Sequence, residues 1–65
     1  MRLKFRIKEQ REKARMTQEE LARKSNVSRT IISGLESGAI TVTTTETLSK
    51  IANALGKSVS DIFFE

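Results

Sequence analysis

The sequence predicts an all-α fold, a compact domain of five short helices within residues 1–65. Its apolar residues recur at helical spacing, most regularly at Leu48, Ile51, Ala52 and Leu55. Residues that cap a helix start precede four of the expected helices: Thr17, Ser28, Thr44 or Thr45, and Ser58. Residues that tolerate the left-handed backbone of a helix end close three of them: Asn26, Gly38 and Gly56.

The start of the chain fits two patterns. Residues 2–8 alternate basic and apolar side chains as a strand does, although Leu3 and Ile7 also fit a helical pair. Residues 1–5 are therefore expected to form an arm or a frayed start, and the first helix is expected over residues 6–14.

Residues 17–38 predict two short helices, over 18–25 and 29–36, joined by a tight turn. Thr17 and Glu20 have the spacing of a capping box, which satisfies backbone amides at the first helix start. Two short helices that meet across so tight a turn can place the second in a DNA major groove.

The remaining segments complete the five-helix prediction. Residues 38–44 are rich in β-branched side chains, which argue against a helix, and the length of the segment suits a loop that Ile40 and Val42 are expected to pin to the core. A fourth helix then ends at Gly56, and residues 58–63 are expected to form a short last helix.

The composition narrows the function classes. The chain has no Cys, His or Tyr, and its carboxylates lie among Lys and Arg at helix-surface spacing, so we expect no enzyme, metal or cofactor. No apolar run could span a bilayer, and together with the lack of Cys this favours a soluble protein in a reducing cytoplasm.

The charged side chains are unevenly distributed. Residues 1–24 carry nine basic against four acidic side chains, and residues 25–65 carry three basic against four acidic side chains. Such asymmetry is typical of a protein with one face on phosphate, although a solvated basic surface fits the charge equally well.

Several motifs stand in register between about residues 6 and 63: Ile7, Arg11, MTQEELA (16–22), VSR (27–29), IS (32–33), LESG (35–38), ETL (46–48), IA (51–52) and ALG (54–56). Together they resemble the Cro/lambda-repressor-like helix-turn-helix family, which includes transcription regulators of the xenobiotic-response-element type. The resemblance implies a lambda-repressor-like fold and a sequence-specific regulator that binds double-stranded DNA.

The resemblance also implies roles for particular residues. Bases would be contacted from the start of the second helix of the motif, by Ser28, Arg29, Thr30 and Ser33. Phosphates would be contacted by Gln18, Arg11, Thr17, Ser37, Thr41 and Thr43. Arg11 and Glu36 match a half-buried ion pair beneath that helix.

Two departures from the family pattern bear on binding. Gly34 stands where relatives often place a longer polar side chain, so it either allows another backbone to approach or leaves part of the groove unread. Residues 39–43 lack the usual Lys, Arg and Pro, so fewer phosphate contacts are expected there.

The C-terminal segment suggests a protein partner. Residues 58–65 are expected to form a homodimer interface through Ile62, Phe63 and Phe64, although Phe63 could instead complete the monomer core. A dimer would read a palindromic operator, as an autoregulating bacterial or phage repressor or a restriction–modification controller would. The alternative is an antitoxin-type or other protein-interaction module with the same fold.

Overall fold

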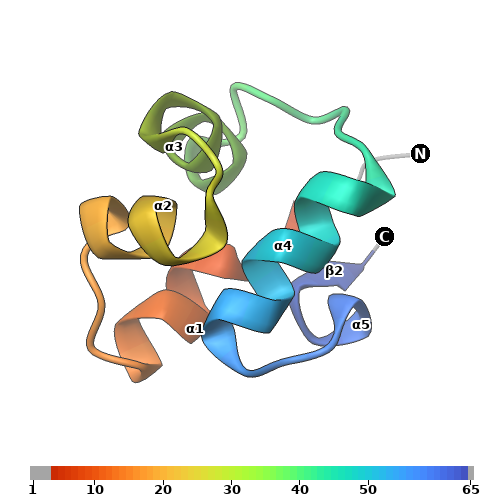
Figure 1. Ribbon diagram of the computed structural model, residues 1–65. Coiled ribbons are helices and arrows are strands. Elements are labelled where there is room, and N and C mark those ends of the chain that lie inside the picture. The colour runs from red at the N-terminus through yellow and green to blue at the C-terminus, as the bar shows by residue number, and fades with distance from the viewer. Residues whose placement is uncertain (1–3, 65) are drawn as a thin grey trace.

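The computed structural model describes the backbone of residues 4–64 and the side chains of residues 5–63. Five helices form the body of the domain, and two very short strands pair beside them (Figure 1). In chain order the elements are β1 (Lys4–Phe5), α1 (Ile7–Lys13), α2 (Gln18–Ser25), α3 (Arg29–Ser37), α4 (Thr45–Leu55), α5 (Val59–Ile62) and β2 (Phe63–Phe64). The prediction of an all-α domain of five helices is confirmed.

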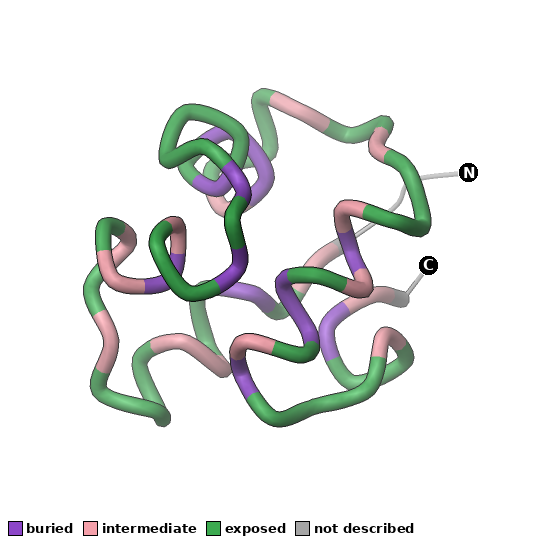
Figure 2. The backbone as a smooth tube through the Cα atoms, in the orientation of Figure 1, coloured by how far each residue is buried: buried purple, intermediate pink, exposed green. Residues whose placement is uncertain are grey.

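The core lies where the five helices face one another. Figure 2 shows the buried stretches on the inner sides of the helices and the exposed stretches on their outer turns and connections. Every helix contributes at least one buried apolar side chain: Ile7, Leu21, Ile32, Leu35, Leu48, Ile51, Ala52, Leu55 and Ile62, with Val27 from the turn after α2. No helix in the described part of the chain is long and apolar enough to cross a membrane.

The helix ends follow the local signals of the sequence. The Thr17 hydroxyl accepts from the Glu20 backbone N–H, and the Glu20 carboxylate accepts from the Thr17 backbone N–H, both at 3.0 Å. The bond from the Thr17 backbone N–H to the carboxylate is the largest cause that lowers the pKa of Glu20, with a further contribution from the Thr17 side chain, because both stabilise the charged form. Asn26 adopts a left-handed backbone with φ of 58° and ends α2, as expected. The Ser28 hydroxyl then accepts from the Ile31 N–H and begins α3.

The chain start differs from the expected arm. Lys4 and Phe5 pair antiparallel with Phe64 and Phe63, and the Arg6 N–H donates to the Ile62 carbonyl at 2.7 Å. The Phe5 and Phe63 rings lie 5.8 Å apart between centroids. The arm prediction is therefore wrong for Lys4 and Phe5, because their partners come from the other end of the chain. Residues 1–3 of the expected arm lie outside the described residues.

The segment between α3 and α4 was predicted correctly as a loop but only partly in its packing. Ile40 is partly buried against the core, as expected. Val42 is 82% exposed, so its expected role as a core anchor is wrong. Ile40 packs against α3 at Gly34, whereas Val42, two residues further on, projects into solvent.

Candidate nucleic-acid interface

One side of α3 is polar and exposed. Arg29, Thr30, Ser33 and Ser37 are all exposed, whereas Ile32 and Leu35 on the opposite side are buried in the core. Because an α-helix has 3.6 residues per turn, positions 29, 33 and 37 lie in one row, with position 30 beside it. We call these four residues the polar face of α3. It includes three of the four expected base-contact residues, and the fourth, Ser28, is the exposed N-cap.

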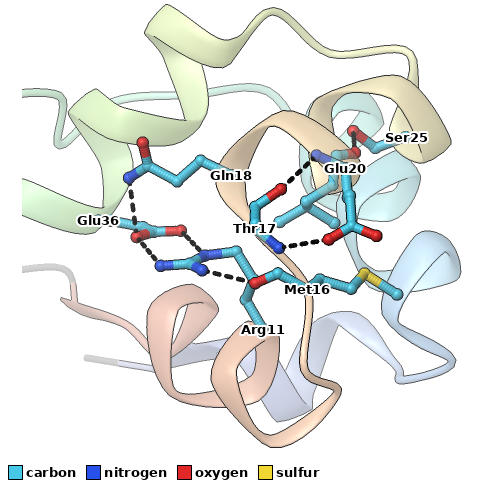
Figure 3. A network of polar contacts seen from close by, with 8 residues as sticks. Arg11, Met16, Thr17, Gln18, Glu20, Ser25 and Glu36 are labelled. Carbon is cyan, nitrogen blue, oxygen red and sulfur yellow. Dashed lines mark hydrogen bonds and ion pairs between the residues drawn. The ribbon is translucent and has the colours of Figure 1, made fainter.

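Beneath α3, four residues from α1, α2, α3 and the loop after α1 form what we call the Glu36 network (Figure 3). Arg11 donates to the Glu36 carboxylate at 2.8 and 3.1 Å through Nε and Nη2. Its Nη1 donates to the Met16 carbonyl at 2.7 Å, and the Gln18 amide donates to Glu36 Oε1 at 3.1 Å. The Arg11 and Glu36 side chains are only 12% and 4% exposed. The network thus ties the end of α3 to α1 and to the start of α2.

The Glu36 network stabilises the charged form of the Arg11 side chain, which is largely buried. The hydrogen bond to Glu36 raises the pKa of Arg11 above its ordinary value, an effect that desolvation partly opposes. The guanidinium also bonds to the Met16 carbonyl and is largely buried, so this geometry fits the expected ion pair better than the expected phosphate contact.

The start of α2 presents donors to its surroundings. The backbone N–H groups of Gln18 and Glu19 have no hydrogen-bond partner within the described residues. These groups lie at the positive end of the helix dipole, where an anion is favoured. The Thr17 hydroxyl is used in the capping box, and one amide hydrogen of Gln18 is used on Glu36. Of these expected phosphate contacts, the backbone N–H of Gln18 is the group without a hydrogen-bond partner among the described residues.

The other expected phosphate contacts lie at the C-terminal end of the polar face of α3 and in the loop after it. The Ser37 hydroxyl donates to the Gly34 carbonyl and accepts from the Ala39 N–H, both at 3.3 Å. The hydroxyls of Thr41 and Thr43 make no hydrogen bond within the described part of the chain. In Figure 1, α3 and the loop after it lie at the top of the view, and α5 lies toward the bottom.

Gly34 lies on the buried side of α3, beneath the loop. The Ile40 N–H donates to the Gly34 carbonyl at 2.9 Å, and a Cβ at position 34 would lie 2.6 Å from Ile40 Cγ1. Of the two expectations for this glycine, the structure supports the close approach of another segment. A longer side chain at this position would collide with Ile40 instead of reaching a groove.

The residues expected at a dimer interface divide into three groups. Ile62 is 0% exposed in the single chain, so its expected interface role is wrong, because the monomer core already covers it. Phe63 is partly buried and packs against the core and Phe5. The Phe64 side chain lies outside the described side chains.

No cluster of three or more potential metal ligands occurs among the residues that the structure describes.

The comparisons with known proteins agree with this geometry. A family model described as helix-turn-helix matches residues 7–62, from α1 to the end of α5. No curated protein matches the chain significantly. The matched span contains the turn between α2 and α3, the polar face and the Glu36 network. The chain belongs to the helix-turn-helix family of Cro/C1 type, whose members are DNA-binding transcription regulators of the xenobiotic-response-element kind.

Proposed function

We propose that the protein is a sequence-specific regulator that binds a palindromic operator in double-stranded DNA as a homodimer and controls transcription of its own gene. The observation that carries this proposal is the polar face of α3. It is exposed on the second helix of the motif, and the Glu36 network fixes that helix in place. A rigid helix with polar side chains on its free side suits direct contact with base edges.

Arg29 is the principal base-reading residue in this proposal. It is exposed at the first turn of α3 and forms no ion pair with any described residue, so its guanidinium is free to bind DNA. The planar guanidinium matches guanine O6 and N7, a contact that gives about 1–3 kcal/mol of discrimination. Thr30 and Ser33 offer hydroxyls, and Thr30 also a methyl group, to neighbouring bases. Ser28 serves first as the cap of α3 and only then as a base contact.

Phosphates would be held at both ends of the motif. At the start of α2 the backbone N–H groups of Gln18 and Glu19 are free to donate, and the Thr17 side chain is exposed beside them. After α3 the hydroxyls of Ser37, Thr41 and Thr43 would contact the next stretch of backbone. We assign Arg11 to the support of Glu36 instead of to phosphate.

The homodimer would form through the end of the chain that carries α5 and β2. Phe63 is only partly buried there, and a 65-residue domain gains stability from a second subunit. Two α3 helices related by a two-fold axis would read half-sites about 34–36 Å apart. Sedimentation equilibrium at micromolar concentration tests this part, and a monomer there would refute it.

Binding is tested by fluorescence anisotropy across a salt series. The duplexes are the DNA upstream of the gene, duplexes selected from a random pool, and a scrambled control. We expect specific binding at least ~10³ tighter than binding to scrambled DNA at physiological salt. Arg29→Ala should flatten the preference at one base position. The matched control is Lys57→Ala, which removes one exposed cation beyond α4 and should leave base preference unchanged. Equal, weak and steeply salt-dependent binding to every duplex would contradict the proposal.

A further inference from the structure

After the Ala39–Ser37 hydrogen bond at its start, the loop between α3 and α4 (residues 39–43) makes one further hydrogen bond within the described residues, at Ile40. Ile40 donates its backbone N–H to the Gly34 carbonyl, and its side chain covers the face of α3 where Gly34 has no Cβ. From residue 40 to residue 43, this is the only hydrogen bond within the described part of the chain. Ile40 also packs against the core cluster. Gly34 and Ile40 are therefore a size-matched pair that joins the loop to α3.

The loop beyond this point carries unused donors. The backbone N–H groups of Thr41, Val42 and Thr43 have no partner in the described structure, and neither do the hydroxyls of the two threonines. All of these groups are uncharged, and residues 38–44 contain no charged side chain. Figure 1 shows the loop continuing from the end of α3 at the same end of the molecule.

We propose that Ile40 is a positioning residue for DNA binding. Its side chain packs against Gly34 and fixes the loop. The backbone N–H groups and hydroxyls of Thr41 and Thr43 are thereby placed to donate to DNA phosphates beside the major groove that α3 enters. This inference rests on the function proposed above. A loop that is already ordered loses less conformational freedom on binding, so the fixed loop binds more tightly than a mobile one. Uncharged contacts release few counterions, so the contribution of the loop does not depend on salt.

The experiment measures anisotropy with the selected operator duplex for Ile40→Ala, for the pair Thr41→Val with Thr43→Val, and for all three changes together. Circular dichroism first establishes a temperature at which each variant is folded. We expect Ile40→Ala and the threonine pair each to weaken binding about tenfold (~1.4 kcal/mol). The combined variant should bind no more weakly than Ile40→Ala alone, because a released loop no longer places its hydroxyls. Plots of log affinity against log salt should shift in parallel, with unchanged slope.

A second set of variants tests the fit between Gly34 and Ile40. Gly34→Ala places a methyl group against the Ile40 side chain and should weaken binding, whereas Gly34→Ala in the Ile40→Ala background should cause no further loss. Ile40→Val keeps a branched side chain over Gly34 and should bind nearly as the unchanged protein does. A purely structural role of Ile40 would alter thermal stability without this dependence on the threonines.

The outcomes separate the two proposals. Independent, multiplying losses from Ile40→Ala and from the threonine pair would overturn the positioning role, and so would unchanged affinity in Ile40→Ala. If Arg29→Ala still alters base preference in those experiments, the proposed function stands and only the inference fails. If no duplex binds specifically, the function fails, and the inference fails with it.

Discussion

The ion pair of the Glu36 network makes a quantitative prediction about stability. In Arg11→Met the side chain keeps an unbranched apolar stem but loses the charged guanidinium, so three hydrogen bonds disappear, two to Glu36 and one to the Met16 carbonyl. The Glu36 side chain, 4% exposed, then keeps only the Gln18 amide as a partner. Removal of one partner from a buried pair costs about 3–5 kcal/mol, because the other charge stays buried without compensation.

That loss is large for a chain of this size. At ~0.05–0.15 kcal/mol per residue, a domain of 65 residues has a total stability of about 3–10 kcal/mol. Since ~1 kcal/mol shifts the Tm of such a domain by ~4–8 °C, Arg11→Met should lower the Tm by more than about 12 °C. Urea and thermal unfolding followed by circular dichroism measure both quantities.

Two further variants give the prediction its controls. Lys13→Met breaks the Lys13–Glu9 pair on the same helix, whose side chains are 67% and 56% exposed, and should cost less than about 1 kcal/mol. Arg11→Met combined with Glu36→Leu removes both buried charges and should recover much of the loss. A cost below about 1 kcal/mol for Arg11→Met, or a double variant no more stable than the single one, would refute the reasoning.

Three other predictions concern caps and loops. Because hydrogen bonds from Thr17 lower the pKa of Glu20 in the folded state, its carboxylate stabilises the fold above its unfolded pKa, and this stabilisation is lost as the pH falls through the folded value. Thermal melts from pH 7 to pH 2.5 should therefore show a shallower acid decline for Glu20→Gln than for the unchanged protein. Val42→Lys should strengthen DNA binding and steepen the salt slope by ~0.9 if the loop lies on phosphate, whereas Val42→Thr should leave the slope unchanged. Arg15 has φ of 57°, so Arg15→Gly should raise stability by about 0.5–1 kcal/mol, and Arg15→Ala should not, in chemical unfolding.

The features that the sequence predicted correctly are those set by near neighbours. The bounds of α2, the left-handed turn at Asn26 and the cap at Ser28 depend on side chains within four residues of the backbone groups they satisfy. Apolar spacing also identified the buried side of α4. One local feature was not predictable from the sequence: the turn after α1 contains a left-handed residue at Arg15, where no glycine or asparagine marks it.

The features that the sequence did not reveal depend on contacts between distant segments. The β1–β2 pairing joins residues at opposite ends of the chain, and no local pattern near Lys4 indicates its partner. No local pattern indicates that Ile40 packs against Gly34 in α3 while Val42 points into solvent. For the candidate site, the polar face of α3 follows from helical spacing alone. Which expected phosphate contacts are already occupied, such as Arg11, becomes visible only in three dimensions.

The Glu36 network connects the stability of the fold to the DNA contacts proposed for α2 and α3. Gln18 lies at the start of α2, where phosphate is expected, and its amide is bonded to Glu36 at the end of α3. A phosphate that binds Gln18 would therefore act on a residue already bonded to α3, the proposed recognition helix. Changes to Gln18 would disturb both the proposed phosphate contact and the position of α3, whereas changes to Arg29 would remove the proposed base contact and leave the helix in place. Base preference in Arg29 variants is for this reason a cleaner measure of recognition than affinity in Gln18 variants.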